Sequence, residues 1–249
     1  MVVPADNPES GTNATPISTA PNFDHLARPY RWLEYLSFGP FLELTRTHFL
    51  TELAGCRHAL ILGDGDGRFT ARLLRANPEI QVRAVDASRK MLRSLQEKAG
   101  RYGHGVTVEV ADIRDWRPET EIQYDLIVTH FFLDCLTTQE VADLAHRLIP
   151  ATASDALWVV SDFAVPPSRF GRAIAAPLVA FLYHAFRLLT NLRVDRLPDH
   201  SQVLAAANWA LRARHTRLWG LLVSELWSAN LNTAPPGEHE SLRPSRPSV

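Results

Sequence analysis

The chain has little cysteine. Only Cys56 and Cys135 occur among its 249 residues, and neither lies in a CxxC pair. Disulfide frameworks and structural zinc sites need several such ligands at short spacings, so we expect reduced thiols and no metal. The N-terminus, MVVPADNPES, also lacks the basic and apolar regions of a signal peptide. These absences favour a cytoplasmic protein.

The chain also lacks an excess of charge of either sign. Its 26 basic and 27 acidic residues give a formal net charge of -1. Proteins that bind the phosphate backbone of a nucleic acid usually present a strongly basic surface. We therefore expect no nucleic-acid partner.

The two ends of the chain differ in composition from its middle. Residues 1–21 and 233–249 are rich in Pro, Ser, Thr and Ala, and such segments cannot bury enough apolar surface to order themselves. We expect two disordered tails around a single domain over residues 22–232. Because 46% of the whole chain is apolar, that domain can bury a substantial core.

The middle of the chain alternates short apolar runs with helical patterns. Residues 22–55 carry apolar side chains at helical spacing and indicate N-terminal helices, broken at Phe38-Gly39-Pro40. Beyond them, strands buried on both faces and separated by helices are typical of a parallel sheet covered on both sides. The expected fold class is α/β. The predicted strands are 58–63, 81–87, 106–112, 124–132 and 155–163, and the predicted helices are 68–77, 88–100 and 138–150.

A glycine-rich turn follows the first predicted strand, in the sequence LILGDGDGRF. Gly63, Gly65 and Gly67 alternate there; glycine permits positive φ and close approach of a ligand, and the next helix directs its positive end to the same place. A tight strand-to-helix turn would need no ligand. Asp86, 19 residues after Gly67, favours a nucleotide-like cofactor, because a carboxylate at the end of the second strand can bind both ribose hydroxyls.

A second acid supports an adenosine. Asp112 ends the third predicted strand and is followed by Ile113. Its carboxylate can accept from an exocyclic amine while the apolar side chain holds a purine ring. A competing interpretation applies to Asp86, which could instead cap the helix that starts near Ser88.

The glycine pattern distinguishes two cofactor families. A dinucleotide fingerprint, GxGxxG, would need glycine at position 68, where this chain has Arg68. The observed GxGxG resembles the first motif of class I S-adenosylmethionine-dependent methyltransferases, and the likeness extends over residues 22–229. The resemblance implies S-adenosyl-L-methionine as cofactor and a Rossmann-like, doubly wound seven-stranded sheet of order 3-2-1-4-5-7-6. It also implies an antiparallel last hairpin around Trp219-Gly220.

The resemblance assigns roles to individual residues. Within the superfamily, the chain is most similar to the ubiquinone and menaquinone biosynthesis C-methyltransferases, on the segments FDHLARPYRWLEYLSFG and VVSDFAVP. That family usually has an acid two residues before the first glycine, where this chain has Ile61, so Asp64 is the candidate partner of the methionine ammonium. The implied cofactor contacts are Tyr30, Gly63, Asp64, Gly65, Gly67, Asp86, Ala87, Asp112, Ile113 and His130.

Methyl transfer from a sulfonium needs mainly alignment and exclusion of water. An acceptor that loses a proton also needs a base. Three residues qualify: His130 at the end of the fourth strand, Asp134 just beyond it, and His200 after RLPD. Each also has a structural alternative. His130 could be a histidine bonded to a backbone carbonyl, Asp134 could only end the loop after the strand, and His200 could belong to a helix start capped by Asp199.

An apolar segment follows the fifth predicted strand. Its longest uncharged stretch, residues 173–183, has 11 residues, against roughly 20 for a membrane span, and Pro177 would kink it. A buried helix, a dimer contact and a peripheral contact with a membrane are all compatible with it. We favour a helical lid over about 168–192, because an insertion at this point would sit above the strand ends.

Together these features predict methyl transfer from S-adenosylmethionine to a small, apolar or aromatic acceptor, by C- or O-methylation, in a monomer or homodimer. One alternative is a protein that binds S-adenosylmethionine without transferring its methyl group. Another is an NAD-dependent oxidoreductase, which the residue at 68 and the final hairpin disfavour. The lack of an Asn-Pro-Pro-aromatic tetrapeptide after the fourth strand argues against a nucleic-acid methyltransferase.

Overall fold

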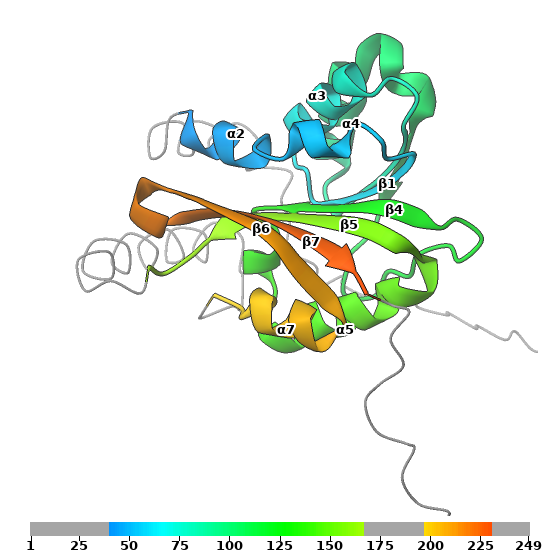
Figure 1. Cartoon of the computed structure of the whole chain (residues 1–249). Helices are drawn as coiled ribbons and strands as arrows, with labels where there is room; N and C mark the ends of the chain where they lie inside the picture. Colours follow the sequence, from blue (N-terminus) through cyan, green and yellow to red (C-terminus); the bar gives the residue numbers. More distant parts are fainter. Residues whose placement is uncertain (1–39, 167–196, 231–249) are drawn as a thin grey trace, which may run out of the picture.

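A computed structural model of the chain describes residues 40–166 and 197–230. These residues form a seven-stranded sheet with helices on both faces (Figure 1). The strands are β1 (His58–Leu62), β2 (Gln81–Asp86), β3 (Val106–Val110), β4 (Tyr124–His130), β5 (Thr152–Phe163), β6 (Trp209–Arg217) and β7 (Leu222–Ala229). The α-helices are α2 (Phe41–Arg46), α3 (Arg68–Ala76), α4 (Arg89–Ala99), α5 (Thr138–Leu148) and α7 (His200–Ala206), and the 3-10 turns are η1 (Leu50–Leu53), η2 (Gly100–Gly105), η3 (Leu133–Cys135), η4 (Ile149–Ala151) and η5 (Leu218–Gly220).

The strand order confirms the predicted topology. The order is β3-β2-β1-β4-β5-β7-β6; β1 to β5 are parallel, and β7 runs antiparallel to both β5 and β6. From β1 in the middle of the sheet, the chain proceeds outward to β2 and β3 and then crosses back to β4 on the other side of β1. The strand order therefore reverses between β1 and β4. In open α/β sheets, ligands bind at the carboxyl ends of the strands at such a point.

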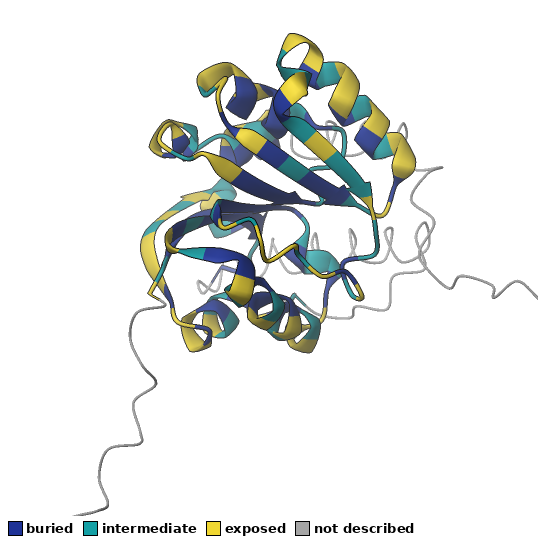
Figure 2. Ribbon diagram, turned by 90° about the vertical axis from the view of Figure 1, so that its right-hand side faces the viewer, coloured by how far each residue is buried: buried dark blue, intermediate teal, exposed yellow. Residues whose placement is uncertain are grey.

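Two apolar layers hold the helices against the sheet. On one face, α3 and α4 pack through side chains such as Phe69, Leu73 and Leu95. On the other, α5 and α7 pack through Leu144 and Leu204. Figure 2 shows buried strands between helices whose outer faces are exposed. This burial on both faces explains why the inner strands β1 and β4 read as largely apolar runs.

The short helix α2 places the N-terminal part of the domain over the sheet. The hydroxyl of Ser161, on β5, donates to the carbonyl of Thr45 at 3.3 Å. Leu42 packs with Leu221 and Leu222 at the start of β7. The α2 helix falls within the predicted helical region 22–55.

Several predicted features lie outside the described residues. They are the tails 1–21 and 233–249, Tyr30, the first part of the N-terminal helices and the predicted lid over 168–192. Within the described ranges, no helix combines the length and apolar character needed to cross a bilayer.

Candidate cofactor and active site

The three glycines of the first turn serve different purposes. All three have positive φ, between 61 and 78°. A Cβ on Gly63 would overlap the ring of Phe132, and a Cβ on Gly67 would overlap the backbone of Leu95 in α4. Around Gly65, by contrast, no heavy atom of the described residues, apart from its own chain neighbours, lies within 4 Å of the place of a Cβ. Two of the glycines therefore allow the protein to pack against itself, and only Gly65 leaves space for a ligand.

Asp64 lies between the first two glycines and anchors the start of α3. Its Oδ2 accepts from the backbone N–H of Thr70 at 3.0 Å and from the Thr70 hydroxyl at 2.6 Å. Burial raises the pKa of Asp64 to about 6, against the opposing effects of these hydrogen bonds and of Arg46. The predicted contact with the methionine ammonium would thus use a carboxylate that also accepts hydrogen bonds from Thr70 in the first turn of α3.

Asp86 ends β2 beside the glycine turn, as predicted. Its Oδ1 accepts from the backbone N–H of Ser88 at 2.8 Å. The N-cap of α4 is Ser88, whose hydroxyl accepts from the backbone N–H of Met91 at 3.3 Å. Asp86 thus orients the turn before α4, whereas Ser88 and not Asp86 is the cap of the helix.

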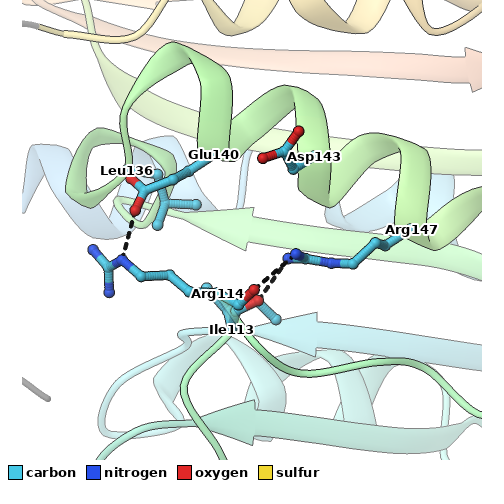
Figure 3. A pocket seen from close by; sticks show the side chains of 6 residues that line it. All are labelled: Ile113, Arg114, Leu136, Glu140, Asp143 and Arg147. Atoms are coloured by element: carbon cyan, nitrogen blue, oxygen red, sulfur yellow. Dashed lines mark hydrogen bonds and ion pairs between the residues drawn. The ribbon is translucent and has the colours of Figure 1, made fainter.

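Asp112 and Ile113 follow β3 and are held against α5. Arg114 Nη1 lies 3.3 Å from Asp112 Oδ1, and Arg114 Nε donates to Glu140 Oε1 at 2.7 Å. Arg147 on α5 donates to the carbonyls of Arg114 and Ile113 at 2.8 and 2.7 Å. Figure 3 shows both arginines reaching between this loop and α5. The contacts fix the loop on which the predicted adenine-binding residues lie, and a pocket beside them is lined by Ile113, Arg114, Leu136, Glu140, Asp143 and Arg147.

His130 ends β4 on the face covered by α2 and α3. The side chain is 3% exposed, and its ring contacts that of Phe69 with centroids 4.4 Å apart. Neither ring nitrogen has a hydrogen-bond partner among the described residues, so the carbonyl contact given as the structural alternative is absent there. Burial, with a smaller contribution from Arg46, lowers the pKa of His130 well below 6.5. The imidazole is therefore neutral at pH 7.

Asp134 is half-buried just past β4 and lies beside a buried acid, Asp162, that the sequence did not single out. The backbone N–H of Asp134 donates to Asp162 Oδ2 at 3.2 Å, and Asp162, near the end of β5, is 1% exposed. Burial raises the pKa of Asp134 to about 6. Burial and the charge of Asp134 raise the pKa of Asp162 well above 3.8. The position of Asp162 near the carboxyl end of a predicted strand was the only signal that could have found it.

His200 is held by a different network. Its Nε2 lies 3.2 Å from Glu225 Oε2, and Glu225 also accepts from Arg214 Nε at 2.7 Å and from Trp227 Nε1 at 2.9 Å. Asp199 caps α7 by accepting from the backbone N–H of Gln202 at 3.0 Å. A buried carboxylate with this many donors stabilises the packing of α7 on the sheet, which favours the structural interpretation of His200.

The chain matches a family model described as a methyltransferase domain, over residues 59–153. Among curated relatives, a tRNA1(Val) (adenine(37)-N6)-methyltransferase of Klebsiella pneumoniae (strain 342) is 29% identical over 168 residues, which cover 61% of this chain and 68% of that protein. A protein of the same name from Salmonella arizonae is 27% identical over 169 residues, with the same coverage of 61% and 68%.

Solved structures share the fold. The apo S-adenosylmethionine-dependent methyltransferase SibL has a TM-score of 0.61 at 19% identity, with 86% of this chain and 63% of that chain covered. An O-methyltransferase family protein from Burkholderia thailandensis has a TM-score of 0.63 at 12% identity, with 83% and 60% covered. The chain thus spans about three fifths of the length of these structures.

The prediction of no nucleic-acid partner was wrong. The curated relatives are named as enzymes that methylate an adenine of tRNA. The inference failed because a net charge of -1 averages over the whole surface, whereas a nucleic acid is recognised by local groups. The match over residues 59–153 shows that the chain contains a region similar to a methyltransferase domain, and the seven-stranded topology is the fold of S-adenosylmethionine-dependent methyltransferases. Both findings support S-adenosylmethionine as the cofactor.

Proposed function

We propose that the protein transfers the methyl group of S-adenosylmethionine to a small, apolar or aromatic acceptor, by C- or O-methylation. The observation that carries this proposal is an apolar cluster at the carboxyl ends of β4 and β5, beside the point where the strand order reverses. Its buried members and the side chains packed against them are Leu42, Phe131, Leu221, Leu222, Phe163, Leu197 and Leu218.

The aromatic side chains of this cluster suit a planar acceptor. The rings of Phe131 and Phe163 lie 5.1 Å apart at an angle of 57°, and the guanidinium of Arg46 lies 5.0 Å from the centroid of Phe131. Phe131 has a positive φ of 51°, a conformation that costs energy in non-glycine residues and often occurs at functional sites. Such walls exclude water, which favours methyl transfer.

The cofactor would lie along the carboxyl edge from β4 to β3. We assign the methionine part to the open turn at Gly65 and to Asp64, the ribose to Asp86 and Ala87, and the adenine to Asp112 and Ile113. His130, neutral and buried, would border the methyl group.

Asp134 is the residue that we assign as base, where the acceptor loses a proton. Its pKa of about 6 lies closer to neutral pH than that of an ordinary carboxyl, and a base works best with a pKa near the working pH. Burial lowers the pKa of His130 and so makes its imidazole a weaker base, and His200 is engaged with Glu225.

A second candidate is methylation of an adenine in RNA, favoured by the names of the curated relatives. An extruded adenine is also planar and would fit the same kind of aromatic wall. The quinone C-methyltransferase branch stays a prediction, because the observations above do not separate carbon from oxygen acceptors.

Formation of S-adenosylhomocysteine tests these proposals. The purified full chain is incubated with labelled S-adenosylmethionine and either a panel of phenols and quinols or unmodified tRNA. S-adenosylhomocysteine and the methylated acceptor are both quantified. Acceptor-dependent turnover with the panel supports the first proposal, and turnover with tRNA alone replaces it with the second. Binding of S-adenosylmethionine without turnover in either arm would contradict both and leave a binding protein.

Changing Asp86 tests the cofactor site separately. Asp86→Ala should weaken S-adenosylmethionine binding by about 1–3 kcal/mol, because the ribose hydroxyls would lose their acceptors. Asp86→Asn keeps an oxygen for the Ser88 N–H and should show a smaller loss. Isothermal calorimetry measures both, with Glu79→Ala, exposed before β2, as control. An unchanged dissociation constant in Asp86→Ala would remove Asp86 from the site.

A further inference from the structure

We propose that His48, His215 and Arg217 form a binding site for a phosphate group carried by the acceptor. This site lies between the end of α2 and strand β6, and no step of the methyl transfer described above uses it. The proposal goes beyond the proposed function, because it concerns a second contact with the acceptor and is compatible with both candidate acceptors.

The geometry brings three nitrogen-bearing side chains together. The rings of His48 and His215 are stacked, with centroids 3.9 Å apart and an interplanar angle of 17°. Arg217 follows His215 by two residues on β6, so both side chains point to the same face of the sheet. All three residues are partly exposed, and a ligand can therefore reach them.

Among the residues that the structure describes, no acid forms an ion pair with the cluster. Arg217 Nε is buried without a hydrogen-bond partner, and in the described part of the chain no ion pair joins a carboxylate to any of the three side chains. Buried polar atoms of proteins usually find a partner. An anion at this place would supply one.

The electrostatics of the cluster are consistent with a missing negative charge. The pKa of His48 is lowered mainly by burial and then by the charges of His215 and Arg217, whereas the charge of Glu52 raises it. Burial, followed by the charge of Arg217, lowers the pKa of His215. The charged or titratable groups that act on these two histidines are thus His215, Arg217 and Glu52, and Glu52 is the one acid among these three. A bound anion would favour the protonated histidines and raise both pKa values.

The sheet register relates this cluster to the proposed methyl site. His130 pairs with Ser161, Ser161 with Ser224, and Ser224 with His215. Three strand spacings separate the two histidines, which places His215 about 14 Å from the end of β4. An acceptor held at the end of β4 could therefore reach the cluster with a phosphate on a tail or on a neighbouring nucleotide.

The experiment measures anion binding to the full chain by calorimetry at pH 5.5 and 8.0. Sulfate is the first probe, since its charge is constant over this range. Phenyl phosphate and a five-nucleotide single-stranded RNA then distinguish a small phosphate ester from a nucleic acid. His215→Gln and Arg217→Gln test the site, and Arg212→Gln, exposed on the same strand, is the control. S-adenosylmethionine binding, measured in parallel, reports on the cofactor site independently.

We expect sulfate to bind about tenfold more tightly at pH 5.5 than at pH 8.0 for each histidine whose pKa rises by one unit. Arg217→Gln and His215→Gln should each weaken binding at least about tenfold, and Arg212→Gln less than twofold. The proposal is overturned if sulfate does not bind at pH 5.5, if its affinity is independent of pH, or if Arg212→Gln has the same effect as Arg217→Gln. Binding of sulfate but of neither phosphate ester would overturn the assignment to the acceptor.

Discussion

Replacing Gly65 with valine is expected to abolish S-adenosylmethionine binding while the protein stays folded. Gly65 has a φ of +61° and open space at the position of a Cβ. A branched side chain would fill that space, and a β-branched residue at positive φ is strained. The strain lies in a turn on the surface of the ligand site, so we expect the sheet and helices to form. Calorimetry with S-adenosylmethionine and circular dichroism measure the two effects.

Two other glycines provide controls for this prediction. Gly67→Ala should destabilise the fold, because its Cβ would overlap the backbone of Leu95. Gly55→Val should affect neither fold nor binding, because a Cβ there meets no described atom within 4 Å and the length of β1 separates Gly55 from the glycine turn. Normal cofactor affinity in a folded Gly65→Val protein would show that the turn is only a structural connection.

Asp134→Asn is expected to reduce turnover by about 10²- to 10⁴-fold, if the acceptor reaction needs a base, and at the same time to stabilise the protein at neutral pH. The carboxyl has an ordinary pKa of 3.8 and a folded-state pKa of about 6. Its contribution is therefore neutral below about pH 4 and becomes destabilising as the pH rises through about 6. Asparagine does not ionise, and it should raise the free energy of unfolding at pH 7.5 by up to about 2 kcal/mol, shared with the neighbouring Asp162.

Urea denaturation at pH 4.5 and 7.5 measures this gain. Asp155→Asn, exposed on β5, should change stability at neither pH. Turnover is measured with the acceptor found by the product assay. A stabilised variant with normal turnover would show that Asp134 is a strained structural residue, and a destabilised variant would show that its carboxylate is needed for packing.

The architecture could be predicted from the sequence because its signals are local. The strands at the centre of the sheet are apolar runs, such as HALIL in β1, whose four residues after His58 are buried. The glycine turn and Asp86 stand at the ends of such runs, and chain direction alone places them at one edge of a parallel sheet. The net charge was a poor guide to partners, since it contains no information on where the charges lie.

The side-chain environments could not be predicted in this way. The sequence shows three equivalent glycines, but packing against Phe132 and Leu95 uses two of them and leaves Gly65 open. Likewise, Asp162 becomes a neighbour of Asp134, 28 residues away in the chain, only when β5 pairs with β4.

The amino-acid pattern alone determined the strands, the helices between them and the residues at their carboxyl ends, because burial and turn geometry act on neighbouring residues. Tertiary packing decided the protonation of His130 and Asp134, the engagement of His200 with Glu225 and the meeting of His48 with His215. These properties depend on desolvation and on charges brought together from distant segments, which no local pattern of residues specifies.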